Sequence, residues 1–244
     1  MKTLTIIPSR LSATRLPGKP LLKINNLSII SHVFKRAQEA NIGDVFVATE
    51  DQEIADDVKK NGGNAILTSG NHKTGSDRIY EAFQKINIKN VDFVMNLQGD
   101  EPIINIMDIV RLNEQMFKKS SKLGTLAAQI KDFKNLENEN IVKVVTKKDL
   151  IEDEFSEAQS FLRNATNVDN IYHHIGIYCY STETLERFVK LSQSKNEIKN
   201  KLEQLRALDN NIKINVALAK SSPIGVDTME DDIALKKIME YKDQ

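Results

Sequence analysis

Residues 4–20, which read LTIIPSRLSATRLPGKP, decide the fold. The consecutive apolar residues of 4–8 predict a strand that is buried on both faces. The strand runs directly into a loop that carries Arg10, Arg15 and Lys19. Ligands of open α/β sheets bind beyond the carboxyl ends of strands, and clustered cations suit phosphate groups. We therefore expect a phosphate-binding loop, with a solvated charged loop as the alternative; it matches neither GxxxxGK[ST] nor GxGxxG.

Strands and helices alternate through the first 100 residues. Short apolar runs predict further buried strands at 45–49, 65–68 and 92–97. Apolar residues three and four apart predict helices between them, at 29–40, 51–61 and 76–86. This alternation is typical of βαβ units on a mostly parallel sheet, so the fold class is α/β.

The pattern is less regular after Asp100. It predicts helices at 105–119, 183–191, 197–209 and 228–242, and strands at 124–130, 141–146, 171–180 and 212–218. Residues 147–170 are polar and have no clear period, which indicates a loop or a mobile flap. We see no internal repeat or Pro/Gly linker, and therefore predict a single domain, 1–244, with an insertion-like region around 120–220.

Composition narrows the class of protein. The chain has 244 residues, 40% of them apolar, which suffices for a sizeable core. Its 34 Lys and Arg balance 34 Asp and Glu, which argues against a basic surface for nucleic acid or a membrane. The single cysteine, Cys179, excludes an intramolecular disulfide and a cysteine-built zinc site. Because the N-terminus lacks the apolar region of a signal peptide and no apolar run approaches about 20 residues, we predict a soluble cytoplasmic protein.

Two carboxylates are candidates for metal binding. Asp100 follows an expected strand in the stretch 96–102, NLQGDEP, where a carboxylate is well placed to hold Mg²⁺. The alternative is that Asp100 starts a turn or caps the next helix. Asp227 precedes the last expected helix and by itself is best interpreted as its cap. Paired with Asp100, it becomes a plausible second carboxylate facing the same phosphates.

Three other features carry chemistry less clearly. Residues 74–78, TGSDR, suit a base or ribose pocket, although Ser76 is equally well explained as a helix cap. His173 and His174 are adjacent on an expected strand and point to opposite faces, so they form a poor metal pair. Cys179 lies in an apolar run and is expected to be buried and inert. No G-x-S-x-G motif supports a Ser/His/Asp triad.

Together, these stretches resemble a known family over nearly the whole chain. The motifs are IIPSRLSATRLPGKPL, VATEDQEIAD, HKTGSDRI, NLQGDEP, VKVV, YHHIGIYCYSTETLERFVKL, LEQLRAL and IGVDTMEDD. In order and spacing they resemble the 3-deoxy-manno-octulosonate (Kdo) cytidylyltransferases, the CMP-Kdo synthetases of Gram-negative bacteria, which are related to the CMP-sialic acid synthetases.

The resemblance implies a Rossmann-like nucleotidyltransferase fold with a mostly parallel central sheet, helices on both faces and an inserted sugar-binding and dimerisation region. It implies a homodimer that joins CTP and Kdo, with Mg²⁺, to give CMP-Kdo and diphosphate for lipopolysaccharide biosynthesis. The site residues that it implies are Arg10, Arg15 and Lys19 for the CTP phosphates, Asp100 and Asp227 for Mg²⁺, Ser76 and Arg78 for the nucleotide, and Gln98, His174, Tyr178, Glu203 and Gln204 for the sugar. Of these, Arg10, Lys19 and Asp100 are the expected catalytic residues.

The residues also fit this chemistry independently. In-line attack of a sugar hydroxyl on the α-phosphorus needs positioning and charge neutralisation but no protein nucleophile. A metal at Asp100 and Asp227 would lower the pKa of that hydroxyl. A nucleotide-binding module without catalysis would be expected to lack one of the cations or carboxylates, and Arg10, Lys19, Asp100 and Asp227 are all present.

One stretch departs from the family pattern. Residues 155–158 read FSEA, so Glu157 stands where the family usually has an arginine facing the sugar. Either Arg163 takes over that role, or the segment no longer contacts the acid sugar in the same way. The departure leaves an alternative substrate open: the same CTP chemistry on another acidic sugar, such as an 8-amino-Kdo or a nonulosonate.

Overall fold

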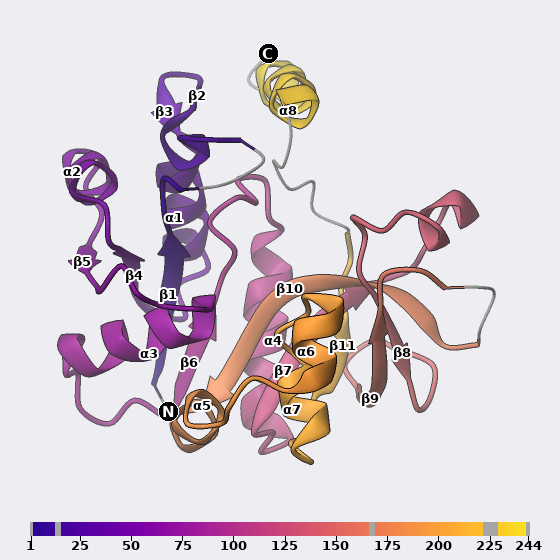
Figure 1. The fold of residues 1–244 in the computed structure, drawn as a ribbon. Coiled ribbons are helices and arrows are strands. Elements are labelled where there is room, and N and C mark those ends of the chain that lie inside the picture. Colours follow the sequence, from indigo (N-terminus) through magenta and orange to yellow (C-terminus); the bar gives the residue numbers. More distant parts are fainter. Residues whose placement is uncertain (1, 13–15, 166–168, 222–228, 243–244) are drawn as a thin grey trace. The chain divides into compact units, whose positions relative to one another are not determined.

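The computed structural model describes residues 2–12, 16–165, 169–221 and 229–242 (Figure 1). The chain forms two compact units. The first unit comprises Lys2–Val91, Asn96–Ile106 and Pro223–Gln244, and the second comprises Asp92–Met95 and Met107–Ser222. The insertion-like region expected around 120–220 falls inside the second unit, which already includes the preceding helix.

The first unit is built from strands and helices in alternation. Its elements are β1 (Thr3–Ser9), the short helix η1 (Lys19–Leu21), β2 (Lys23–Ile24), β3 (Leu27–Ser28), α1 (Ile29–Glu39), β4 (Gly43–Thr49), α2 (Gln52–Lys60), β5 (Ala65–Leu67), α3 (Gly75–Ile86) and α8 (Met229–Lys242). The strands and helices predicted up to residue 86 are therefore confirmed, with ends that differ by one or two residues.

The main strands of the first unit are parallel, in the order β5-β4-β1. The chain moves outward from β1 to β5 and then returns to the free side of β1, where the Leu97 N–H donates to the Ile6 carbonyl at 3.3 Å. Right-handed crossovers then require α1 and α2 on one face of the sheet and α3 on the other. In agreement, α1 contacts α2, whereas α3 packs on β1, β4 and β5 (Figure 1).

The loop after β1 is anchored in a small apolar cluster. Leu16 is buried with Ile24, Ile29 and Leu235, the last from α8. Burying such side chains stabilises by about 25 cal/mol per Å² of apolar surface, so this cluster helps to hold the loop beside the helix that closes the chain. Asp227, the expected cap of α8, lies outside the described residues.

The second unit has a mixed sheet with helices around it. Its elements are β6 (Phe93–Asn96), α4 (Ile106–Lys118), β7 (Leu123–Ala128), the short helix η2 (Phe133–Leu136), β8 (Lys143–Thr146), β9 (Phe155–Leu162), β10 (Ile171–Ser181), α5 (Thr182–Val189), α6 (Lys195–Asn200), α7 (Leu205–Asp209) and β11 (Asn215–Leu218).

Most strand pairs of the second unit are antiparallel. The order is β6-β10-β7-β11-β9-β8, and the N-terminal part of β10 also pairs with β8. Only β7 and β11 form a parallel pair among the strand pairs that we describe in this unit. The expectation of a mostly parallel sheet therefore applies to the first unit and is wrong for the second. Local hairpin pairing of β8, β9 and β10 needs no crossover helix, which explains the difference.

The prediction of a loop or mobile flap over 147–170 is wrong for its middle. Residues Phe155–Leu162 form β9, which is antiparallel to both β8 and β11. Its polar residues concealed it, because Glu157, Gln159 and Ser160 interrupt the apolar pattern that marks a buried strand.

The helix predicted at 197–209 is two helices, α6 and α7. Lys201 adopts a left-handed conformation with φ of 53°, which ends α6. A buried ion pair joins the two helices: the Arg206 guanidinium donates to both oxygens of Glu197 at 2.6 and 2.9 Å. The same guanidinium lies 4.7 Å from the centre of the Phe188 ring.

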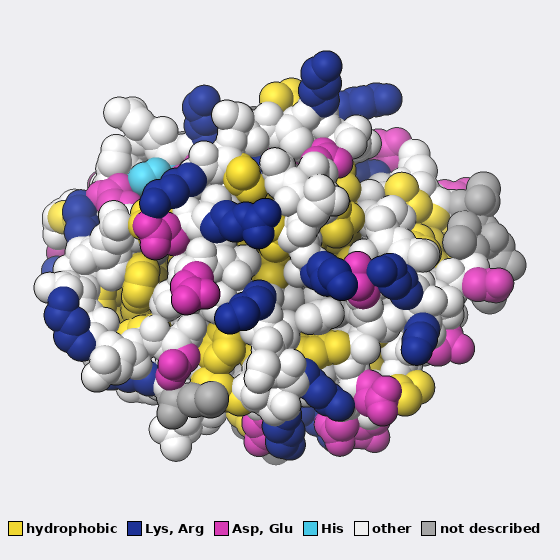
Figure 2. Space-filling model, turned by 90° about the horizontal axis from the view of Figure 1, so that it is seen from below, with side chains coloured by type: hydrophobic (Ala, Val, Ile, Leu, Met, Phe, Trp, Pro, Cys, Tyr) yellow, Lys and Arg dark blue, Asp and Glu magenta, His cyan; other side chains and the backbone are white. Residues whose placement is uncertain are grey.

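The surface carries charges of both signs. Figure 2 shows one face of the molecule, on which Lys and Arg side chains are interspersed with Asp and Glu. Among the residues that the structure describes, no helix combines the length and the apolar character needed to cross a membrane.

Replacing Lys201 by glycine is expected to stabilise the protein by about 0.5–1 kcal/mol, because glycine adopts a positive φ without steric cost. The measurement is the free energy of unfolding in urea. The matched control is Lys199→Gly within α6, which should destabilise by about 1 kcal/mol. Equal destabilisation by both substitutions would contradict the role assigned to the Lys201 conformation.

Candidate functional site

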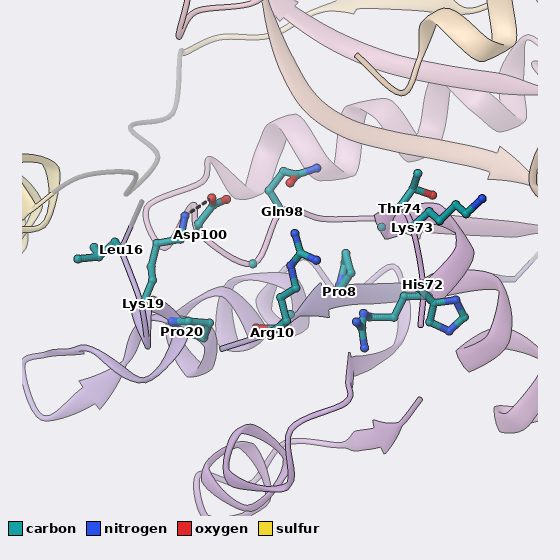
Figure 3. A pocket seen from close by; sticks show the side chains of 14 residues that line it. Pro8, Arg10, Leu16, Lys19, Pro20, His72, Lys73, Thr74, Gln98 and Asp100 are labelled. Atoms are coloured by element: carbon teal, nitrogen blue, oxygen red, sulfur yellow. Dashed lines mark hydrogen bonds and ion pairs between the residues drawn. The ribbon is translucent and has the colours of Figure 1, made fainter. Parts of the chain in front are cut away.

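A cavity of about 410 Å³ lies in the first unit, beyond the carboxyl end of β1 (Figure 3). Its lining comes from three loops and the start of α3: Pro8, Ser9, Arg10, Leu16, Lys19, Pro20, His72, Lys73, Thr74, Gly75, Arg78, Gln98, Gly99 and Asp100. The structure thus brings together five residues expected from the sequence, namely Arg10, Lys19, Arg78, Gln98 and Asp100.

Close backbone approach positions two of these loops. Gly99 lies so near the first strand that an added Cβ would be 3.0 Å from the Pro8 carbonyl oxygen and 3.3 Å from Ile30 Cδ1. A side chain at residue 99 would therefore push the chain after β6 away from β1. With glycine there, Gln98 and Asp100 reach the same cavity as Arg10.

An ion pair occupies one end of the cavity. The Lys19 ammonium lies 2.7 Å from a carboxylate oxygen of Asp100, and the two side chains are 13% and 30% exposed. Gly18, with φ of 71°, turns the chain so that Lys19 begins η1. Arg10 makes no ion pair with any residue in the described ranges, and in Figure 3 its guanidinium extends toward the side where Gln98 lies. The cavity therefore holds a cation whose charge is not matched by a described acid.

The other end of the cavity is formed by the loop before α3 and by its first turn. Thr74 caps α3 in a capping box with Asp77, so the alternative that Ser76 is the cap is wrong. Ser76 is buried in the first turn and is not among the lining residues. The guanidinium of Arg78 donates to Glu50 at 2.5 Å and to Thr68 Oγ1 at 2.7 Å.

Two predicted residues lie outside the described residues: Arg15, in 13–15, and Asp227, in 222–228. Within the described part of the chain, no group of three or more His, Cys, Asp or Glu side chains is arranged to hold a metal. Asp100 nevertheless suits Mg²⁺, because its carboxylate lines the cavity and already has a cation, the Lys19 ammonium, at 2.7 Å. Mg²⁺ commonly takes one or two protein carboxylates and completes its shell with water and phosphate oxygens.

Four of the expected sugar residues lie in the second unit. His174 is buried on β10, and its Nε2 lies 3.0 Å from Thr125 Oγ1. The Thr125 hydroxyl has one proton, which goes to the Ile177 carbonyl at 2.7 Å, so His174 Nε2 must be the donor. Burial, with a contribution from His173, lowers the pKa of His174 to about 3. The ring is therefore neutral near pH 7.

Tyr178 lies beside His174, with ring centres 5.5 Å apart. Its hydroxyl is buried and has no hydrogen-bond partner among the described residues. Burial, followed by the charges of Tyr180 and Glu203, raises the pKa of the Tyr178 phenol well above its usual value. Gln204 is the residue before α7 and makes no capping bond with its side chain. A buried, unpartnered hydroxyl is costly, which is typical of a position where a ligand supplies the partner.

Glu157 does not share the face of Tyr178. The register places Glu157 opposite Asn215, Asn215 opposite Gly124 and Gly124 opposite Cys179. Paired residues share a face and neighbours along a strand alternate, so Tyr178 projects from the other face. The Glu157 carboxylate instead pairs with Lys147 at 2.9 Å and with Lys213 at 3.6 Å, and these two lysines hold the pKa of Glu157 below its usual value.

Arg163 binds to the backbone of its own unit. Its guanidinium donates to three backbone carbonyls, those of Glu139, Asn200 and Lys201, each at 3.0 Å. These contacts join three segments of the second unit. These contacts favour the second alternative, that the segment around Glu157 no longer contacts the sugar in the same way, and Glu157 itself is not on the face of His174 and Tyr178.

Three polar lining residues were not assigned a role from the sequence: Ser9, His72 and Lys73. The stretch HKTGSDRI did mark their neighbourhood. Spacing alone could not show which of its side chains face the cavity, because that depends on where α3 begins.

Comparisons with known proteins show the fold and the family of the chain. A family model described as Cytidylyltransferase matches residues 4–214. A UDP-glucose pyrophosphorylase structure, 14% identical with a TM-score of 0.70 and complete coverage of both chains, shares the fold. The α/β fold is thus that of the nucleotidyltransferases.

More similar proteins define the branch. A 3-deoxy-manno-octulosonate cytidylyltransferase of Afipia carboxidovorans is 42% identical over 240 residues, 97% of this chain and 96% of that protein. One of Thermodesulfovibrio yellowstonii is 41% identical over 254 residues, 99% of this chain and 100% of that protein. A structure of CMP:2-keto-3-deoxy-manno-octonic acid synthetase complexed with CTP is 32% identical with a TM-score of 0.89, and covers 99% of this chain and 100% of that chain. The chain belongs to the 3-deoxy-manno-octulosonate cytidylyltransferase family.

The lowered pKa of His174 has a consequence for stability. Between pH 6.5 and about 3 the unfolded chain binds a proton at this residue and the folded chain does not, so stability falls as the pH decreases below 6.5. The slope is at most about 1.4 kcal/mol per pH unit. We expect His174→Gln to show a shallower loss in urea unfolding at pH 7, 6 and 5. Titration of the His174 ring near pH 6.5 in the folded protein, seen by NMR, would contradict this.

Proposed function

We propose that this protein transfers CMP from CTP to the anomeric hydroxyl of Kdo. The hydroxyl oxygen forms a bond to the α-phosphorus, the bond from that phosphorus to the bridging oxygen breaks, diphosphate leaves and the hydroxyl proton is lost. The observation that supports this most is the cavity that joins Arg10, Lys19 and Asp100 at one edge of the sheet. A triphosphate needs cations and a metal-binding carboxylate together.

In this proposal the cations bind and orient the phosphates. Arg10 has no acidic partner among the described residues, so its charge is available to the triphosphate. Lys19 is paired with Asp100 at 2.7 Å, and both groups must reorganise when anionic phosphates and a metal arrive. We propose that Arg15 contributes to the same phosphate loop, and that Ser76 helps to place the nucleotide by fixing the first turn of α3.

Asp100 would hold Mg²⁺, with Asp227 as the proposed second carboxylate. A bound Mg²⁺ neutralises phosphate charge and lowers the pKa of the attacking hydroxyl. No protein nucleophile is required. Cys179 fits this description, because it is fully buried and burial raises the pKa of its thiol far above the usual value.

The sugar is proposed to bind through Gln98, His174, Tyr178, Glu203 and Gln204. The hydroxyl groups of Kdo suit the Glu203 carboxylate, which lies near Tyr178. The Tyr178 phenol, which has no partner among the described residues, can donate to an oxygen of the sugar. We also propose a cytoplasmic homodimer acting in lipopolysaccharide biosynthesis, without nucleic acid or membrane partners. Light scattering in solution tests the dimer.

The acceptor is tested by measuring diphosphate release from CTP and Mg²⁺ with Kdo, 8-amino-Kdo and a nonulosonate. Kdo should be the best substrate. Strong turnover of another sugar with none for Kdo would overturn the proposed acceptor. Binding of CTP without turnover of any sugar would favour a module that has lost catalysis.

Asp100→Asn should reduce diphosphate release by about 100-fold or more, because the amide removes the proposed metal ligand and its charge. The matched control is Asp44→Asn, since Asp44 pairs with Lys2 on the surface at 3.2 Å. That variant should keep normal activity. Full activity of Asp100→Asn, with an unchanged melting temperature, would reject the proposed role of Asp100.

Tyr178→Phe should raise KM for Kdo about tenfold, as expected for one lost hydrogen bond to substrate, without reducing stability. The matched control is Tyr172→Phe. The Tyr172 hydroxyl accepts from Leu150 N–H and donates to Asp149, so its loss should cost about 1 kcal/mol of stability and leave KM unchanged. A normal KM in Tyr178→Phe would argue against the sugar contact.

A further inference from the structure

Arg78 is held in place on several sides. It lies in the first turn of α3, lines the cavity, and has a side chain that is only 4% exposed. One terminal nitrogen donates to Glu50 at 2.5 Å, and the other donates to Thr68 Oγ1 at 2.7 Å. Glu50, which directly follows β4, is 22% exposed. The guanidinium therefore has a fixed plane and a fixed charge partner.

A second acid stabilises the same loop. Both carboxylate oxygens of Glu81 accept from the Ser69 N–H, at 3.1 and 3.0 Å, and the carboxylate also contacts His72 Nε2 and Lys85 Nζ. Although burial raises the pKa of Glu81, these hydrogen bonds hold it at about 2. Glu81 is thus ionised at any physiological pH, and it gives the loop 68–74 an anchor in addition to the hydrogen bonds from Arg78 to Thr68 and to the Ser69 carbonyl.

The charges differ between the two ends of the cavity. Figure 3 shows Lys19 and Asp100 at one end and His72, Lys73 and Thr74 at the other, with Arg10 between them. Arg78 belongs to the second end, because it follows Thr74 by four residues on α3. There its positive charge is already balanced by Glu50. A balanced guanidinium keeps its directional N–H groups but attracts a phosphate weakly.

We infer that Glu50 is a positioning residue, which holds the Arg78 guanidinium so that it donates to a neutral oxygen of the nucleoside, a base carbonyl or a ribose hydroxyl, and not to a phosphate. The inference rests on the proposed use of CTP. The nucleotide role of Arg78 and the phosphate role of Arg10 and Lys19 belong to that proposed function, and the role of Glu50 is added to them.

The test is Glu50→Gln, which removes the charge and keeps an acceptor of the same shape. Calorimetric titration should show affinities for CMP and CTP reduced by the same factor, about tenfold, with diphosphate binding unchanged. In turnover, KM for CTP should rise about tenfold and kcat should change less than threefold. A reduced effect with 2′-deoxy-CTP would identify the ribose hydroxyl as the acceptor, and an equal effect would identify the base; both agree with the inference.

The opposite result has a distinct form. If Arg78 faces a phosphate, removing its counter-charge should tighten CTP and diphosphate binding, and that outcome overturns the inference. Unchanged affinities overturn it as well.

Two more variants support the test. Glu50→Asp should recover part of the CMP affinity that Glu50→Gln loses. If Glu50→Gln does not fold, Thr68→Val, which removes another side-chain partner of Arg78, should weaken CMP binding. The matched control is Glu152→Gln, whose acid pairs with Arg111 at 2.6 Å in the second unit and should not affect CTP binding. Failure of the unaltered protein to bind CTP would instead reject the proposed function.

Discussion

The close approach of two backbone segments is the constraint on which the site depends. The Leu97 N–H donates to the Ile6 carbonyl. Two residues further on, Gly99 lies so close to Pro8 that a side chain at residue 99 would not fit. Because these two segments of the first unit lie in contact, the loops that follow them open onto one space. Arg10 and Asp100, 90 residues apart in the chain, face the same cavity for this reason alone.

Opposite charges in contact are the second organising feature. Lys19 with Asp100 and Arg78 with Glu50 are both partly shielded from water, where leaving either partner alone would cost several kcal/mol. The pairs differ in what can replace the partner. Asp100 has the oxygens that a metal prefers, whereas Glu50 lies behind a guanidinium that two further acceptors already hold. One pair is therefore suited to exchange and the other to rigidity.

The predictable part of the fold is the part made by local pattern. Periodicity located β1, α1, β4, α2, β5 and α3, because each buries one apolar face or run against its sequence neighbours. Periodicity missed β9, because polar residues such as Glu157 interrupt its apolar pattern. This strand is held by its pairing with β8 on one side and β11 on the other. Periodicity also missed the break between α6 and α7, since a left-handed Lys201 has no composition signal of the kind that glycine gives.

For the site, the residue types and their order along the chain identified the family and named Arg10, Lys19, Arg78, Gln98 and Asp100 as functional candidates. Only the tertiary structure decided which groups contact each other, that Thr74 caps α3, and that Glu157 faces away from Tyr178. The reason is physical. Local propensity depends on neighbours a few residues away, whereas the partner of a charged or buried polar group depends on strand register and backbone approach across the whole unit.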